Sequence, residues 1–246
     1  MITGGPFFLV DDVPQPGRFR LVGAEGRHAA TVRRLRPGES LVLTDGAGRL
    51  APATVVEADR AELTLDVRAT EVVGPPAVRV TLVQAVPKGD RGELAVELAT
   101  EAGVDAVVPW TAARCVARWR SAEQAAKGLG RWRATAREAA KQSRRPFVPE
   151  VFEVASTGAV IGLIERAAGA LVLHESAGTS LRTAALPETG DVVLIVGPEG
   201  GLTGEEVTVF GSAGAVPVRL GAQVLRTSTA AAVALGALGV LTGRWT

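Results

Sequence analysis

The sequence has few of the residues that disulfide bonds and metal sites require. Cys115 is the only cysteine, so the chain cannot form an internal disulfide. The only histidines are His28 and His174, and a zinc site would need further ligands that are not clustered in this sequence. We therefore expect no metal site.

Long apolar runs are also missing. The first ten residues contain no basic segment followed by a long apolar stretch, which a secretory signal would need. No window approaches the length of unbroken apolar residues that spans a bilayer. We expect a cytoplasmic protein without a membrane partner. Hydrophobic residues make up 47% and charged residues 22%, a balance that is typical of folded globular chains.

The charge is small overall but unevenly distributed. A net charge of +1 taken alone argues against a nucleic-acid partner. Residues 114–145, however, contain ten Lys or Arg and two Asp or Glu, which gives +8, and the rest of the chain carries −7. Such a segment predicts an anionic partner. The alternative is a solvated helix face.

The length of 246 residues predicts a small domain followed by a medium-sized one. A helix is expected over residues 24–35. Its basic residues either contact a phosphate backbone or belong to a solvated helix. The consecutive prolines Pro75 and Pro76 interrupt the pattern, so we place the domains at residues 1–73 and 78–246. Four short strand-like runs predict a small β-barrel in the first domain. They are residues 7–10, 40–43, 53–56 and 63–67.

From residue 78 onward, short apolar runs alternate with segments of helical periodicity. This alternation predicts an α/β domain with a parallel sheet covered by helices on both faces. The expected strands are residues 78–85, 104–110, 170–173, 192–196 and 216–220. A helix is expected over residues 121–143, with one packing face and one cationic face. The packing face carries Trp132, Ala136, Ala139 and Ser143, and the cationic face carries Arg133, Arg137, Lys141, Arg144 and Arg145.

Polar or glycine-rich segments follow three of the expected strands. Residues 197–203 read Gly-Pro-Glu-Gly-Gly-Leu-Thr, and Thr203 with Glu206 predicts a capping box at the next helix. Ligands of parallel sheets bind at the carboxyl ends of strands, where glycines allow the backbone to approach closely. The spacing is neither a dinucleotide fingerprint nor a Walker loop, which disfavours those ligands. A tight structural turn is the alternative.

The other two junctions carry Arg226 and His174. Arg226 lies among small and apolar residues, where a permanent charge needs an anion. That anion is either the carboxylate of Glu199, or a phosphate or developing negative charge on a ligand. His174 is either a base or a histidine that is hydrogen-bonded for structural reasons.

These junction residues resemble those of a known family. His174 with its neighbours, residues 195–206 and residues 220–230 are similar to the bacterial small-subunit (16S) ribosomal RNA uridine N3-methyltransferases, the RsmE family of the SPOUT superfamily. Further blocks resemble that family in order along the chain. They are His28, 32–33, 37–39, 83–90, 101–104, 131–132 and 138–145. Two positions depart from the pattern: Gln223 stands where arginine is usual, and Ser228 where glutamate is usual.

The resemblance implies a fold, a reaction and partners. The fold would be an N-terminal PUA-like β-barrel plus a C-terminal SPOUT α/β domain with a trefoil knot. The reaction would be methylation of uridine N3 in 16S ribosomal RNA by S-adenosyl-L-methionine, on naked RNA or on the small ribosomal subunit. A homodimer would complete each catalytic pocket. Two alternatives remain: a non-catalytic RNA-binding factor in ribosome assembly, and a SPOUT methyltransferase acting on another RNA position.

The resemblance also implies site residues. Arg226 would stabilise the uracil anion, and Glu199 would accept the proton or orient its loop. The implied cofactor-binding residues are Leu173, His174, Glu175, Gly197, Pro198, Gly200, Gly201, Leu220, Gly221, Val224, Leu225, Thr227 and Thr229. The basic residues implied to bind RNA are Arg33, Arg34, Arg114, Arg118, Arg133, Arg137, Lys141, Arg144 and Arg145.

Overall fold

The chain forms two compact units, which a computed structural model describes over residues 5–245. The first unit comprises the chain up to Pro75 together with Ala140–Val148. The second comprises Pro76–Ala139 and the chain from Pro149 onward. The sequence places residues 140–148 in the second domain, whereas in the structure they belong to the first unit.

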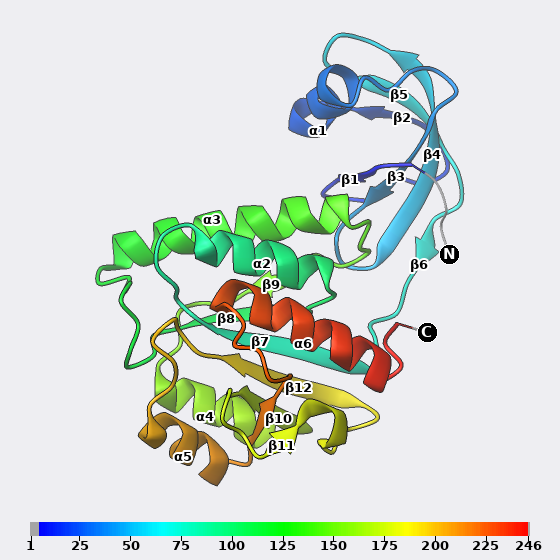
Figure 1. Ribbon diagram of the computed structural model, residues 1–246. Helices are drawn as coiled ribbons and strands as arrows, with labels where there is room; N and C mark the ends of the chain where they lie inside the picture. The colour runs from blue at the N-terminus through cyan, green and yellow to red at the C-terminus, as the bar shows by residue number, and fades with distance from the viewer. Residues whose placement is uncertain (1–4, 246) are drawn as a thin grey trace. The chain divides into compact units, whose positions relative to one another are not determined.

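The first unit is a mostly antiparallel sheet in the order β1-β3-β4-β5-β2, and β6 pairs with β4 (Figure 1). Its strands are β1 (Phe7–Leu9), β2 (Gly17–Leu21), β3 (Ser40–Thr44), β4 (Arg49–Ala58), β5 (Leu63–Val67) and β6 (Glu71–Val72). A bulge between Val55 and Glu57 interrupts the register of β4 with β5, which increases local twist. The sheet encloses its own core, which includes Phe8, Leu41 and Leu65.

Apolar runs in the sequence predicted four of these strands, whereas β2 and β6 were not predicted. In β2, which reads Gly-Arg-Phe-Arg-Leu, only the last residue is buried. Such a strand carries a weak apolar signal, and its pairing with β5 places it in the sheet. The predicted helix is present as α1 (Gly23–Arg27), followed by one π-helical turn, η1 (His28–Val32).

The second unit is a seven-stranded sheet in the order β11-β13-β10-β12-β7-β8-β9, and every pair in it is parallel. Its strands are β7 (Val78–Ala85), β8 (Ala106–Trp110), β9 (Glu150–Val151), β10 (Gly169–Leu173), β11 (Thr179–Ser180), β12 (Gly190–Val196) and β13 (Val216–Arg219). Its helices are α2 (Arg91–Glu101), α3 (Ala122–Gln142), α4 (Thr157–Arg166), the short 3-10 turn η2 (Leu181–Thr183), α5 (Gly204–Ser212) and α6 (Thr227–Leu241). The predicted parallel α/β class is confirmed.

Helices cover both faces of this sheet (Figure 1). Helices α2, α3 and α6 pack on one face, where Trp132 and Leu194 are among the fully buried side chains. Helices α4 and α5 pack on the other, around Trp110, Phe210 and Ile195. Strands buried on both faces explain why the sequence shows continuous apolar runs instead of alternation.

Most of helix α3 follows the sequence prediction, with one correction. Trp132, Ala136 and Ala139 are buried, as expected for the packing face. Lys141, assigned to the cationic face, is buried in the first unit, and its Nζ lies 2.9 Å from a carboxylate oxygen of Glu25. Because residues 140–142 at the end of α3 belong to the first unit, the helical period alone could not predict this contact.

The end of the chain is anchored by a buried ion pair. After α6, Arg244 donates a hydrogen bond of 2.8 Å to Asp105 and one of 2.6 Å to the carbonyl of Gly103. It also donates to the carbonyl of Val78, and the same Asp105 oxygen accepts the N–H of Val80 at 2.7 Å. These bonds attach the end of α6 to the starts of β7 and β8.

Candidate functional site

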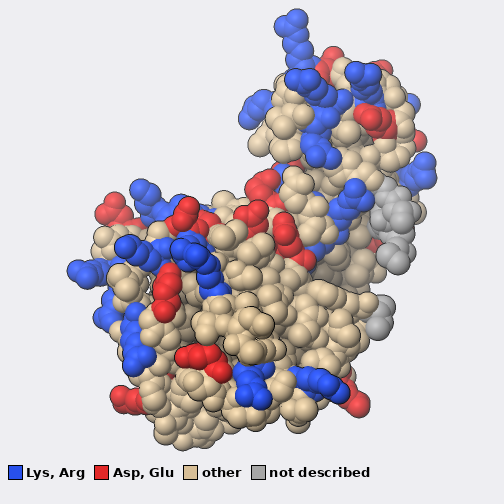
Figure 2. Space-filling view, in the orientation of Figure 1, with Lys and Arg blue, Asp and Glu red and all other residues tan. Residues whose placement is uncertain are grey.

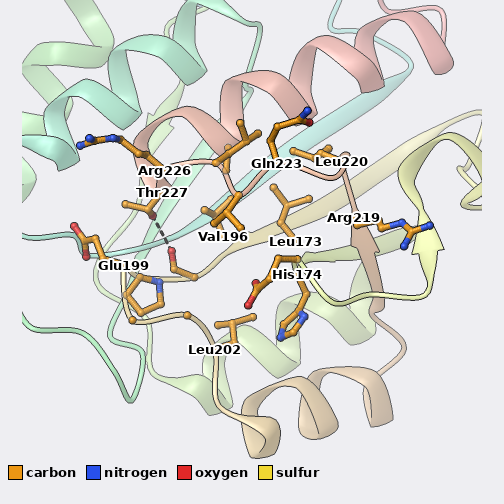
Figure 3. A pocket seen from close by; sticks show the side chains of 18 of the residues that line it. Leu173, His174, Val196, Glu199, Leu202, Arg219, Leu220, Gln223, Arg226 and Thr227 are labelled. Carbon is orange, nitrogen blue, oxygen red and sulfur yellow. Dashed lines mark hydrogen bonds between the residues drawn. The ribbon is translucent and has the colours of Figure 1, made fainter.

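A pocket opens at the carboxyl ends of the neighbouring strands β13, β10 and β12 (Figure 3). The three junctions that the sequence singles out are therefore adjacent in space, although up to 53 positions separate them in the chain. The cavity has a volume of about 450 Å³, within the range of roughly 300–1,000 Å³ that small-molecule sites occupy.

Almost all of the proposed cofactor-binding and catalytic residues line this pocket. They are Leu173, His174, Glu175, Gly197, Pro198, Glu199, Gly200, Gly201, Leu220, Gly221, Val224, Leu225, Arg226 and Thr227. Thr229 is not among the lining residues; it is half-buried in the first turn of α6. The two positions that depart from the family pattern also differ from each other: Gln223 lines the pocket, whereas Ser228 is buried.

The segment Gly197–Thr203, here called the glycine loop, approaches other parts of the chain closely. A Cβ atom on Gly200 would lie 3.2 Å from the Cβ of Arg114, and Gly201 has a φ of +70°. The loop ends at the predicted capping box, in which Thr203 and Glu206 bond each other's backbone N–H groups. A side chain would be crowded at the first position and strained at the second, so glycine suits both.

Two charged residues fasten the glycine loop to the segment that follows β8. One guanidinium nitrogen of Arg114 donates to the carbonyls of Gly200 and Leu202, at 3.1 and 3.2 Å. The buried carboxylate of Glu206 accepts the N–H of Thr203 at 2.8 Å and the N–H of Ala113 at 2.7 Å. Arg114, predicted to bind RNA, therefore supports the pocket wall.

A third connection runs from β7 through the first turn of α6. The buried amide of Gln84 donates a hydrogen bond of 2.9 Å to the hydroxyl of Thr227. That hydroxyl donates in turn to the carbonyl of Gly197 at 2.7 Å (Figure 3). Sequence reasoning gave Gln84 no role, because the run 78–85 also contains the polar residues Arg79 and Thr81, and only the structure shows that Gln84 is the buried one.

Within the described part of the chain, no ion pair joins Arg226 to Glu199, so the structural alternative for Arg226 is not realised. Arg226 is exposed and immediately precedes α6. Glu199 instead accepts the backbone N–H of Lys88 at 3.1 Å. Both side chains lie on the same side of the pocket, opposite Arg219 (Figure 3). Because Arg226 is exposed, water can solvate its guanidinium, which is also accessible to an anionic ligand in the pocket.

His174 is placed at the end of β10 with one ring nitrogen engaged. Its Nδ1 accepts the backbone N–H of Ser176 at 3.2 Å. A neutral imidazole that accepts at Nδ1 carries its proton on Nε2, which then acts as a donor. This geometry favours a binding role for His174 over a role as base.

Sequence reasoning missed several other residues that line the pocket. They are Arg91, Val196, Leu202, Val218, Arg219 and Ala230. Arg91 comes from the first turn of α2, after β7, which lies on the far side of β12 from β10. No local sequence pattern predicts that such a residue lines the pocket, because the order of the strands determines which segments lie there.

The basic residues proposed to bind RNA differ in exposure. Arg33, Arg34, Arg118, Arg137 and Arg144 are exposed, and Arg145 is half-buried. Arg133 is half-exposed and pairs with Glu153 at 2.8 Å. Figure 2 shows Lys and Arg side chains gathered on the second unit near the start of α3.

The only cysteine, Cys115, directly follows Arg114, which holds the glycine loop. It is buried in the core that α4 and α5 cover. Burial raises the pKa of the Cys115 thiol above its ordinary value, against a weaker opposing effect of a backbone hydrogen bond with Ala112. The thiol is therefore a packing group with low reactivity.

Comparisons with known proteins assign the family. The family model of the RNA methyltransferase domain matches residues 75–239, and that of the RNA methyltransferase PUA domain matches residues 21–68. Ribosomal RNA small subunit methyltransferase E of Mycobacterium bovis is 55% identical over 97% of this chain and 92% of its own length. This chain belongs to the ribosomal RNA small subunit methyltransferase E family. The enzyme of the same name from Bacillus subtilis is 29% identical over 91% of this chain and 90% of its own.

Solved structures of the methyltransferase E family and its neighbours share the fold. The Neisseria gonorrhoeae enzyme, crystallised with S-adenosyl methionine, has a TM-score of 0.82 at 27% identity and covers 96% of this chain and 98% of its own. A Legionella pneumophila methyltransferase in complex with the same cofactor has a TM-score of 0.82 at 27% identity and covers 97% and 98%. The two units are thus an N-terminal PUA domain and a C-terminal α/β methyltransferase domain of the SPOUT type.

The structure also bears on metals and membranes. Within residues 5–245, no three His, Cys, Asp or Glu side chains lie close enough together to hold a metal ion. Among the helices of the same residues, none has the length and hydropathy that crossing a bilayer requires.

Proposed function

We propose that this protein transfers the methyl group of S-adenosyl-L-methionine to N3 of a uridine in 16S ribosomal RNA. Its membership in the methyltransferase E family supports this, since relatives of that name include a structure crystallised with the cofactor. The observation that carries the proposal is the pocket at the ends of β13, β10 and β12. Both glycine-rich backbone and Arg226 line this pocket, and the Arg226 guanidinium has no ion pair among the described residues. A ribosomal RNA substrate implies work in the bacterial cytoplasm.

The pocket has the chemistry that this cofactor needs. Apolar side chains of Leu173, Leu220 and Leu225 can cover an adenine ring, and the glycine loop lets backbone groups approach the ribose. We assign cofactor binding to the lining residues named above and to the exposed N–H and C=O groups of their loops. Because Thr229 does not line the pocket, it would act through the first turn of α6.

For this reaction the protein must align the reacting atoms and stabilise the negative charge on the uracil. Bound in this pocket, the cofactor supplies a methyl group that its sulfonium already activates. Arg226 stabilises the uracil anion that forms when N3 loses its proton. The pocket walls hold N3 in line with the methyl group and exclude water. Glu199 orients the segment after β7 through the N–H of Lys88, and it is also the candidate for accepting the N3 proton.

The substitution Glu199→Gln separates these two roles. Glutamine still accepts the N–H of Lys88 but cannot take up a proton. If Glu199 only orients its segment, kcat stays within about threefold of wild type; if it is the base, kcat falls by about a hundredfold or more.

RNA would bind through the exposed arginines of both units. The structure narrows the set that the sequence suggested, since Lys141 is buried against Glu25 and Arg114 supports the glycine loop. Arg33 and Arg34 on the first unit and Arg118, Arg137 and Arg144 along the basic segment remain exposed. We assign RNA binding to these five exposed residues and to Arg133 and Arg145.

The proposal includes a homodimer and a trefoil knot, both of which the family resemblance implies. Apolar side chains that are exposed on α6 support the dimer: Val233, Val240 and Leu241 lie open on a helix without charged residues. Figure 2 shows few charged side chains over this part of the second unit. Such a patch is typical of a protein interface. Light scattering after size exclusion tests this, because Val240→Lys should yield a monomer if the patch is the interface.

Mass spectrometry tests the reaction. Small subunits from a strain lacking the gene should have lost one methyluridine, and purified protein with the cofactor should restore it. If calorimetry finds no affinity for S-adenosylmethionine, the protein is a non-catalytic RNA-binding factor. A restored methyl group at another position would identify a SPOUT methyltransferase of different specificity.

A further inference from the structure

Gln84 is an isolated polar side chain at the carboxyl end of β7. It is fully buried, next to the apolar residues Val83 and Ala85. Its amide Nε2 donates to the carbonyl of Ala85 at 3.0 Å and to the hydroxyl of Thr227 at 2.9 Å. A carbonyl can only accept a hydrogen bond, so the NH₂ group must face Ala85 and the orientation of the amide is determined.

The amide also determines the direction of the next hydrogen bond. Because the hydroxyl of Thr227 accepts from Gln84, its own proton is free to be donated, and the carbonyl of Gly197 accepts it at 2.7 Å. We call these two bonds the Gln84–Thr227–Gly197 chain. It connects the end of β7, the first residue of α6 and the first residue of the glycine loop.

The hydrogen bonding of Gln84 is unfavourable for the stability of the fold. The Oε1 atom of Gln84 is buried and has no hydrogen-bond partner in the part of the chain that the structure describes. A buried acceptor left unsatisfied costs about 1–3 kcal/mol. A methionine of similar volume would avoid that cost. Residues that break such local rules are expected where function requires them.

The two segments that the chain connects are not equally secured elsewhere. The glycine loop is also held through Arg114, through the capping box and through the bond from Lys88 to Glu199. The start of α6 has no comparable bond among the described residues, since Arg226 at its N-cap makes no side-chain capping hydrogen bond. Loss of the chain should therefore move Arg226 more than the cofactor loop.

We propose that Gln84 is a positioning residue for methyl transfer: through the hydroxyl of Thr227 it sets where α6 begins and thus where the guanidinium of Arg226 stands. This inference rests on the proposed function, because it gives Arg226 its task. It predicts that Gln84 contributes to turnover and contributes little to folding or to cofactor affinity.

The variant Gln84→Met tests this directly. The wild-type stability or a slightly higher one is expected, because methionine has no unsatisfied acceptor. We expect kcat on small subunits to fall by about ten- to a hundredfold, the size of effect that a misplaced reacting group produces. The Kd for S-adenosylmethionine by calorimetry should stay within about threefold of wild type. A wild-type kcat, or a loss of affinity that parallels the loss of kcat, overturns the proposal.

A second pair of variants keeps the test decisive if Gln84→Met does not fold. Thr227→Val removes the hydroxyl, and Thr227→Ser keeps it. The serine variant should recover most of the kcat that the valine variant loses, and equal kcat values in the two contradict the proposal. Thr81→Val on the same strand is the matched control, since its side chain makes no hydrogen bond within residues 5–245 and lies outside the pocket. If the wild-type protein methylates nothing, the proposed function fails. If the wild-type protein is active and the Gln84 and Thr227 variants have the same kcat as the wild type, only the role of Gln84 is wrong.

Discussion

The substitution Arg244→Met breaks the buried ion pair that holds the end of α6 against the parallel sheet. Arg244 and Asp105 are each 9% exposed as side chains. Methionine preserves apolar volume but removes the guanidinium that pairs with the Asp105 carboxylate. It also removes the donors that serve the carbonyls of Gly103 and Val78. The perturbation therefore leaves one buried charge and two carbonyls with fewer partners.

The expected cost follows from these hydrogen bonds. Removing one partner of a buried pair costs about 3–5 kcal/mol, mainly because the remaining charge stays buried. Asp105 keeps the N–H of Val80 at 2.7 Å, which reduces the penalty. We expect the free energy of unfolding to fall by about 4 kcal/mol, a large share of the roughly 5–15 kcal/mol that stabilise a typical protein.

Urea denaturation followed by circular dichroism measures this cost. The control is Arg182→Met, since Arg182 is exposed and makes no ion pair among the described residues; a change within about 0.5 kcal/mol is expected there. The double variant with Asp105→Asn should cost less than the sum of the two single variants. A loss below about 1 kcal/mol for Arg244→Met, or additive single effects, would refute the reasoning.

Three further predictions concern the charges and a fourth concerns the thiol. Lys141→Ala should lower the free energy of unfolding by about 3 kcal/mol, because Glu25 remains buried, and it should leave the salt dependence of RNA binding unchanged. Arg137→Glu should instead lower the slope of log Kd against log salt by about 0.7 for each phosphate that is no longer neutralised. Arg226→Ala should lower kcat by about a hundredfold with little change in the Kd of the cofactor by calorimetry. Cys115, whose pKa burial raises, should react with iodoacetamide more slowly in native than in urea-unfolded protein.

Each of these expectations has a contradicting result. An altered salt slope for Lys141→Ala would place Lys141 in the RNA interface, and an unaltered slope for Arg137→Glu would take Arg137 out of it. Equal losses of kcat and cofactor affinity would reassign Arg226 to binding. For Cys115, the raised pKa means that the folded state favours the neutral thiol. Its stabilising contribution is thus present below the ordinary thiol pKa and is lost as pH rises, and a native alkylation rate equal to the unfolded rate would contradict burial.

Local patterns in the sequence were sufficient for much of the fold and for the junctions that line the pocket. The apolar runs of the second unit predicted β7, β8, β10, β12 and β13 because strands buried on both faces carry no alternation. The capping box of Thr203 with Glu206 is present as predicted, since its bonds are formed between residues three apart. The three junctions that line the pocket were all identified from strand ends and glycines.

What the tertiary structure alone decided are the contacts between segments far apart in the chain. The parallel order β13-β10-β12-β7 brings the three junctions together and adds Arg91 from α2 and Gln84 from β7. Packing also determined that Lys141 is buried against Glu25 instead of facing solvent. Helical and strand periods record which face of an element is apolar. They do not record which other element covers that face, and this choice depends on the packing of the whole chain.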